Sequence, residues 1–244
     1  MDLSVIVDNL PRFASGAWIT VQLTALAVLL GLLLAVPVAL ARLSPNPLLS
    51  WPAYAYMFYF RGTPLLVQIF LIYYGSGQFV PELRAIGLWQ FFREPYFCAV
   101  LTLTLNTAAY TAEILRGAIR AVPYGEVEAG RAFGMPRALI LRRVILPKAF
   151  RLALPAYTNE VIFLFQATSL VSIITIMDLT GVGRVIIAES FRTFEVWIFV
   201  GLCYLVMSYA ILYGFRRLEY RLSGHLREGP AVAAPPAEEA LAVR

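Results

Sequence analysis

Residues 13–41 read FASGAWITVQLTALAVLLGLLLAVPVALA and contain no Asp, Glu, Lys or Arg. A helix that crosses the hydrocarbon core of a bilayer needs about 20 mostly apolar residues, so this stretch is long enough for one tilted span. The residues before it include Asp2, Asp8 and Arg12 and lack the positively charged segment that opens a cleaved signal peptide. We therefore expect a retained transmembrane helix.

The same composition extends along the chain. Of the 244 residues, 60% are hydrophobic and 14% are charged, whereas a soluble domain carries about 25% charged residues. Further runs without charge cover residues 62–81, 95–112, 161–177 and 196–215. The sequence RGTP at 61–64 interrupts the second apolar stretch, so we start that helix near Ala53 and expect a kink at Pro64. The prediction is an all-α, polytopic membrane protein with five transmembrane helices.

The distribution of basic residues predicts the orientation. Cytoplasmic loops of membrane proteins carry an excess of Lys and Arg. With five spans, a periplasmic N-terminus and a cytoplasmic C-terminus place most of the 20 basic residues inside. Many of them lie in a loop at about 116–151. We expect the transmembrane domain to cover residues 1–225, and a disordered cytoplasmic tail rich in Ala, Pro and Glu to cover 226–244.

The sequence lacks the residues needed for a metal site, a His-based active site or a phosphate-binding loop. Cys98 and Cys203 fall inside predicted spans and His225 is the only histidine, so neither a metal site nor a His-based active site is expected. A phosphate-binding loop needs Gly-Lys-Ser/Thr, but the only lysine, Lys148, is followed by Ala149. If ATP drives this protein, another chain binds it. The net charge of +5 is explained by the membrane orientation, and nucleic-acid binding is not expected.

The loop between the third and fourth spans carries the most specific pattern. PYG at 123–125 is typical of a turn, Glu126 and Glu128 suit the first turn of a helix, and Gly134 suits its end. A second short helix is expected at about 137–144, ending before the Leu-Pro pair at 146–147. By these residues alone, the first helix either fits a groove of a partner or lies on lipid headgroups.

The run EAGRAFG at 128–134, followed after nine residues by VILP at 144–147, resembles the EAA loop of ABC importer permeases. That pattern reads E-A-A, three residues, G, nine residues, I-x-L-P. Here Gly130 replaces the second Ala, and Val144 replaces the Ile. The stretches RGTPLLVQ at 61–68, YTAEILRGA at 110–118 and ATSL at 167–170 resemble the polar and basic amino-acid branch of the same family, which includes histidine and octopine/nopaline permeases.

The resemblance implies a non-catalytic permease subunit in the bacterial inner membrane that binds no cofactor itself. It implies three partners: a dimer of ATPase subunits that holds ATP and Mg, a second permease subunit that is either identical or homologous, and a periplasmic solute-binding protein. Coupling to the ATPase is then expected at Glu126, Glu128, Ala129, Gly130, Ala132, Phe133 and Gly134. The alternative is a self-sufficient secondary transporter or channel, a class that more often has internal repeats, and this chain has no evident repeat.

Polar residues within the spans are candidates for the substrate path. An ionisable residue in lipid costs at least about 2.5–3.5 kcal/mol, so it usually faces a partner or a cavity. The candidates are Glu160, Asn159, Gln166 and Thr168 in the fourth span and Asn106 in the third. Members that resemble the histidine and opine permeases carry Glu at position 160, and a carboxylate there suits cationic amino acids or opines. Alternatively, Glu160 pairs with an arginine such as Arg151, or it is protonated.

Three further charged residues are interpreted as structural. Glu113 and Arg116 have the i, i+3 spacing of an ion pair on a helix surface. Arg61 either extends its side chain toward the cytoplasmic interface or holds the kink at Pro64. The aromatic run at 54–60 is typical of a belt at the membrane interface, and no site is assigned to it.

Overall fold

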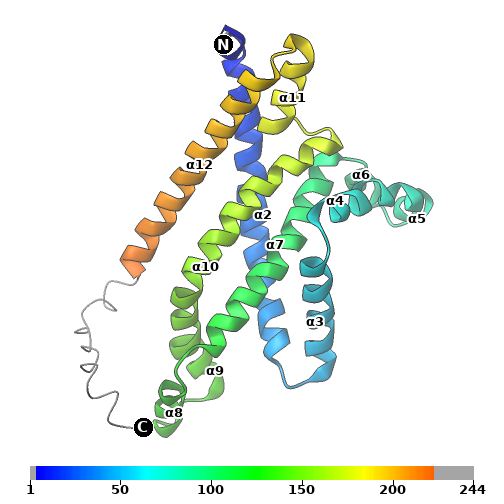
Figure 1. Ribbon diagram of the computed structural model, residues 1–244. Coiled ribbons are helices and arrows are strands. Elements are labelled where there is room, and N and C mark those ends of the chain that lie inside the picture. Colours follow the sequence, from blue (N-terminus) through cyan, green and yellow to red (C-terminus); the bar gives the residue numbers. More distant parts are fainter. Residues whose placement is uncertain (1–3, 223–244) are drawn as a thin grey trace, which may run out of the picture.

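The computed structural model describes residues 4–222, and every regular element in that range is helical (Figure 1). The predicted tail at 226–244, the end of the predicted domain and His225 lie outside the described residues. The elements are α1 (Ser4–Asp8), α2 (Leu10–Leu43), α3 (Pro47–Gly62), α4 (Leu65–Tyr73), η1 (Gly75–Phe79), α5 (Val80–Ala85), α6 (Trp89–Phe92), α7 (Pro95–Arg120), α8 (Tyr124–Ala132), α9 (Arg137–Ile140), η2 (Leu141–Ile145), α10 (Leu146–Ala167), η3 (Thr168–Ile174), α11 (Leu179–Ser190) and α12 (Thr193–Leu222).

Four helices in the described range are long and apolar enough to cross a membrane. They cover Leu10–Leu43, Pro95–Arg120, Arg137–Ile174 and Thr193–Leu222. A fifth span results if the bent pair Pro47–Gly62 and Leu65–Ala85 is counted as one. The all-α prediction is confirmed, and the number of candidate spans agrees with the predicted five when the bent pair is included. Several helices extend past the uncharged runs and include charged residues, such as Arg120 in α7 and Lys148 in α10.

The second predicted span contains a break sharper than a kink. α3 ends at Gly62, α4 begins at Leu65, and the two segments are bent by 107°. Thr63 and Pro64 have extended backbone conformations, as expected because proline disfavours the helical conformation of the residue before it. As a result, α4, α5 and α6 project sideways from the upright helices (Figure 1).

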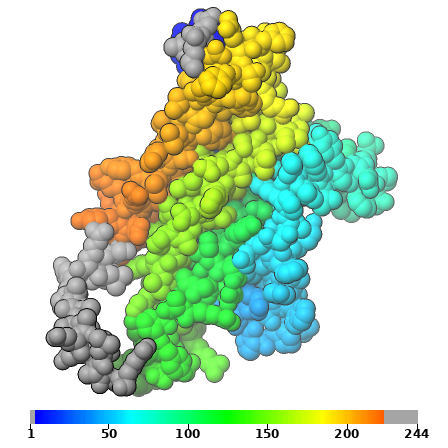
Figure 2. Space-filling model, viewed as in Figure 1, coloured from blue at the N-terminus to red at the C-terminus, as the bar shows by residue number. Residues whose placement is uncertain are grey.

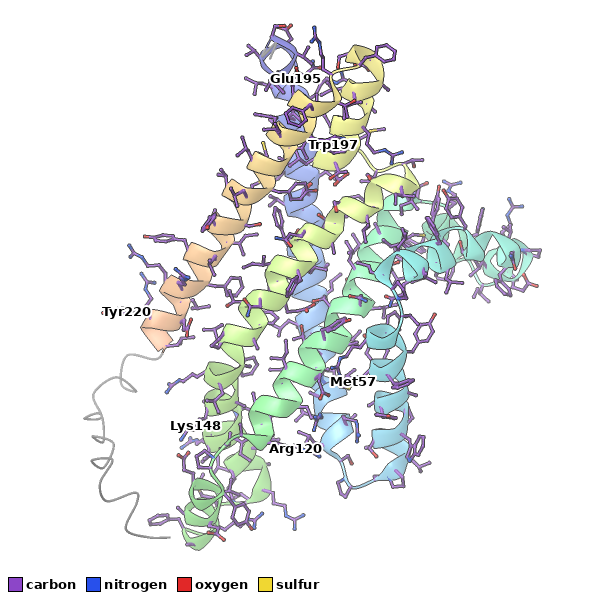
Figure 3. All side chains as sticks on the ribbon, viewed as in Figure 1. Met57, Arg120, Lys148, Glu195, Trp197 and Tyr220 are labelled. Atoms are coloured by element: carbon purple, nitrogen blue, oxygen red, sulfur yellow. The ribbon has the colours of Figure 1, made fainter. Side chains whose placement is uncertain are left out.

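Helix α12 lies at the edge of the molecule (Figure 2). In the most apolar stretch of α7, 61% of residues are buried, compared with 11% for α12. Small residues allow α2 to approach α7 closely: a Cβ added at Gly31 would lie 2.5 Å from Thr107 Cγ2. Glu195 and Tyr220 mark the two ends of α12 in Figure 3.

The prediction that a helix at 137–144 ends before the Leu-Pro pair is wrong. Residues Arg137–Ile174 form one continuous helical rod made of α9, η2, α10 and η3. A turn of π-helix, Leu141–Ile145, precedes the proline, and the Leu146 N–H donates to the Leu141 carbonyl. Pro147 has no N–H to donate, and this wider turn accommodates it at the start of α10 without ending the helix.

Candidate substrate path and coupling surface

Two amide side chains, Gln68 and Asn106, form hydrogen bonds at the break between α3 and α4. Gln68 is 1% exposed, and its Nε2 lies 2.8 Å from the Phe60 carbonyl, 3.0 Å from the Thr63 carbonyl and 2.8 Å from Thr63 Oγ1. Its Oε1 accepts from Asn106 Nδ2 at 3.0 Å. Carbonyls at a helix end lack partners within the helix, and lipid offers no donors. Gln68 therefore supplies donors that the broken backbone needs.

Asn106, which the sequence suggested for the substrate path, takes part in the same arrangement. It is buried on α7, and its Nδ2 also donates to the Phe60 carbonyl at 3.3 Å. These contacts give Asn106 a structural task at the break. A contact between Asn106 and substrate stays a prediction.

Glu160 has a neutral partner on the neighbouring helix. Its Oε1 accepts a hydrogen bond of 2.9 Å from Thr107 Oγ1, which belongs to α7. The glutamate is half-buried in α10, and Thr107 is 2% exposed beneath Gly31 of α2. The carboxylate is thus held between two spans by a hydroxyl group. Pairing of Glu160 with Arg151 stays a prediction.

The other three candidates on this helix do not converge on Glu160. Asn159 is exposed. Gln166 is exposed as well and lines a separate cavity of about 520 Å³ with Thr180, Tyr204 and other residues of α11 and α12. Thr168 is fully buried, and its hydroxyl donates to the Phe165 carbonyl at 2.7 Å. The five predicted residues therefore form no single cluster in this chain.

The charged residues toward the C-terminal end of α7 pair as expected. Arg116 donates to Glu113 through Nε at 2.9 Å and through Nη2 at 2.5 Å, which confirms the predicted i, i+3 contact. Arg61 lies 3.6 Å from the same carboxylate. Arg61 and Glu113 line a cleft of about 410 Å³ toward α10, and all three residues line a second cleft of about 480 Å³ toward α2 and α3. Arg61 thus links the end of α3 to α7.

Helix α8 presents one exposed face and one packed face. Gly130 is buried, and a Cβ there would lie 3.3 Å from Ile140 Cγ1, so glycine permits close approach of α9. Glu126 forms an ion pair with Lys148, which Figure 3 marks near the start of α10. Gly134 follows with a φ of +73°, a backbone conformation that favours glycine. Five of the predicted coupling residues are exposed: Glu128, Ala129, Ala132, Phe133 and Gly134.

The sequence interpretation missed a buried carboxylate, Asp178. It is fully buried just before α11, where its Oδ1 accepts from the Gly181 N–H at 2.8 Å and its Oδ2 accepts from Tyr204 at 3.2 Å. Burial raises the pKa of Asp178 to about 6. Asp before an apolar, glycine-containing stretch is a helix N-cap signal, and that signal could have revealed both Asp178 and α11.

Comparison with known proteins agrees with this architecture. The chain is 46% identical to the nopaline transport system permease protein NocM of Agrobacterium fabrum, over 98% of this chain and 99% of that protein. It is 48% identical to the octopine transport system permease protein OccM of Rhizobium radiobacter, over 85% and 84%. It is 42% identical to the histidine/lysine/arginine/ornithine transport system permease protein HisM of Escherichia coli, over 87% and 90%.

Solved structures have the same fold. A chain of an amino acid ABC transporter crystallised with histidines superposes with a TM-score of 0.82 at 36% identity, covering 91% of this chain and 99% of that one. A chain of the MetNI methionine ABC transporter in an inward-facing conformation matches with a TM-score of 0.73 at 22% identity, over 88% and 98%. Residues 27–224 match the family described as the binding-protein-dependent transport system inner membrane component, and the chain belongs to that family.

Proposed function

We propose that this chain is the permease subunit of an ABC importer that passes cationic amino acids or opines inward across the bacterial inner membrane. The N-terminus is periplasmic and the C-terminus is cytoplasmic, in line with the distribution of its basic residues. The family membership supports the subunit type. The names of the relatives, which refer to nopaline, octopine, histidine, lysine, arginine and ornithine, support the substrate class.

The observation that carries the substrate class is the placement of Glu160. The carboxylate is half-buried between two membrane helices, and its hydrogen-bond donor is the Thr107 hydroxyl rather than a cation. None of the ion pairs among the described residues includes Glu160, and Arg61 attracts its carboxylate only at longer range. In surroundings of low dielectric constant, such a carboxylate attracts a guanidinium or ammonium group and offsets its loss of hydration. Asn159, Gln166, Thr168 and Asn106 are proposed as further polar positions along the path.

Coupling to ATP is assigned to α8. Its exposed face, with Glu128, Ala129, Ala132 and Phe133, offers a partner an apolar and acidic surface, and Phe133 is 88% exposed. The partner is a dimer of ATPase subunits that holds ATP and Mg. A second permease subunit, identical or homologous, completes the pore, and a periplasmic solute-binding protein delivers the substrate. The sparse packing of α12 within the chain is in keeping with a further membrane partner.

The test compares uptake of arginine and glutamine by the complete transporter before and after Glu160→Gln. Arginine uptake is expected to fall roughly tenfold, which corresponds to about 1.4 kcal/mol, while glutamine uptake is retained. The control is Glu82→Gln, which removes an exposed carboxylate on α5. Equal loss of both substrates, or loss of neither, would contradict a role for Glu160 in selecting cations.

A second arm of the experiment tests the subunit type. Uptake should require the ATPase subunit and ATP. If vesicles that contain this chain without any ATPase accumulate arginine, the chain is a self-sufficient transporter, and the importer assignment fails.

A further inference from the structure

A basic cleft lies where α2, α3 and α7 meet, at the end of the bundle that carries α8. Its volume is about 480 Å³, and its charged lining consists of Arg42, Arg61, Glu113, Arg116 and Arg120. Arg42 lies in the last turn of α2, and Arg120 lies in the last turn of α7. Figure 3 labels Arg120 on α7 and Met57 on α3, two residues that both line this cleft.

The cleft carries excess positive charge. Its single carboxylate, Glu113, already accepts two hydrogen bonds from Arg116 and lies 3.6 Å from Arg61. Neither Arg42 nor Arg120 forms an ion pair with another residue in the described range 4–222. The cleft therefore holds four guanidinium groups against one carboxylate, and Arg42 is attracted to Glu113 only at longer range. A cationic substrate would be repelled by this excess of arginines, and Glu160 does not line this cleft.

One wall of the cleft is apolar and open. Tyr54 and Phe58 of α3 are 42% and 67% exposed, and Trp51 on the same helix is 69% exposed. Arg42 stacks over the Tyr54 ring at 4.9 Å, which brings the charged end of the cleft directly against the aromatic surface. A ligand that fills both parts has an anionic head and a hydrocarbon tail.

The geometry points to a binding site for an anionic phospholipid, with its phosphate on Arg42 and Arg120 and an acyl chain along Tyr54 and Phe58. Guanidinium groups bind phosphate oxygens through paired hydrogen bonds, and basic pockets between membrane helices on the cytoplasmic side bind anionic headgroups. The assignment rests on the membrane placement and orientation proposed above. It adds a lipid ligand that is separate from the transported substrate.

The test measures lipid binding to the purified transporter by native mass spectrometry, with phosphatidylglycerol and phosphatidylcholine offered together. The wild type is expected to prefer phosphatidylglycerol. Arg42→Gln together with Arg120→Gln should lower the phosphatidylglycerol binding constant at least about fivefold, the effect of roughly one basic residue near an anionic headgroup. The matched control removes Arg84 and Arg93, two exposed arginines on the projecting segment, and should keep the preference.

Two further measurements separate the alternatives. Added phosphatidylglycerol should raise the thermal midpoint of the wild type and the control more than that of the double variant, and inorganic phosphate alone should not reproduce this rise. The assignment is overturned if the double variant still prefers phosphatidylglycerol over phosphatidylcholine, or if inorganic phosphate raises the thermal midpoint as the lipid does. It is also overturned if the double variant keeps phosphatidylglycerol but loses its ATPase subunit on purification. Because transport is not measured, such a failure leaves the import assignment intact.

Discussion

Replacing Gln68 by Leu should destabilise the fold at the break between α3 and α4. Leu fills a similar volume but has no N–H, so the Phe60 carbonyl loses one of its two amide donors and the Thr63 carbonyl loses the donor that Gln68 supplies. Asn106 also loses its acceptor. Hydrogen bonds between membrane helices contribute about 0.6 kcal/mol on average and up to about 1.7 kcal/mol. The Thr63 hydroxyl loses the same donor. Four lost hydrogen bonds, with buried groups left unsatisfied, should cost about 2–4 kcal/mol.

The assay is equilibrium unfolding in mixed micelles with increasing SDS, combined with hydrogen exchange of the amides around residues 57–68. Gln78→Leu is the matched control because Gln78 is exposed in the neighbouring η1. Exchange should accelerate at the break in Gln68→Leu and stay unchanged in the control. The reasoning is refuted if the two variants lose the same free energy of unfolding, since Gln68 would then add nothing beyond its volume.

Three further outcomes are expected from the same physical arguments. Gly31→Ala places a methyl group 2.5 Å from Thr107 Cγ2, and the overpacking should cost about 1–3 kcal/mol by the same unfolding assay; an unchanged free energy would mean that α2 and α7 separate easily. Gly134→Val should reduce substrate-stimulated ATPase activity without reducing membrane insertion, because valine disfavours a φ of +73°. The control is Gly125→Val, because Gly125 lies in α8 and a Cβ added there has no atom within 4 Å. The pKa of Asp178 is raised in the folded protein from 3.8 to about 6, so its contribution to stability should be greatest at and below about pH 4, fall by up to about 3 kcal/mol between about pH 4 and 6, and then level off. Asp178→Asn should abolish this dependence, and a variant with an unchanged pH profile would assign the dependence to other groups.

The spans were predictable because lipid imposes a strict rule on composition. Residues 13–41 and 196–215 fall within α2 and α12, since a long run without charge has no other stable environment. The ion pair of Glu113 and Arg116 was also predictable, because both residues belong to one helix and their spacing sets the distance. Local rules of this kind suffice wherever the partners lie within a turn of each other.

The rest depends on contacts between distant segments. Nothing local to Gln68 indicates that it caps a helix end with the help of Asn106, because the two are 38 positions apart. One local feature was also mispredicted: the rod from Arg137 to Ile174 continues through Pro147 because a π-turn directly precedes it, whereas proline patterns alone predicted an end there. Glu160 contacts Thr107 of α7, whereas Gln166 lines a cavity with residues of α11 and α12, and this division depends on how the helices pack.

The continuous rod connects the contact with α8 to the Glu160 carboxylate through a single helix. Lys148 at its lower part holds α8 through Glu126, and Glu160 lies 12 residues further along the same helix, about 18 Å away at 1.5 Å per residue. An unbent helix between Lys148 and Glu160 would move as one body, so that a displacement at Lys148 would also displace Glu160. Pro155 lies between the two contacts, inside α10, and is the one proline along that length. Pro155 is therefore the position along this length at which bending would reduce how far a movement of α8 displaces the Glu160 carboxylate.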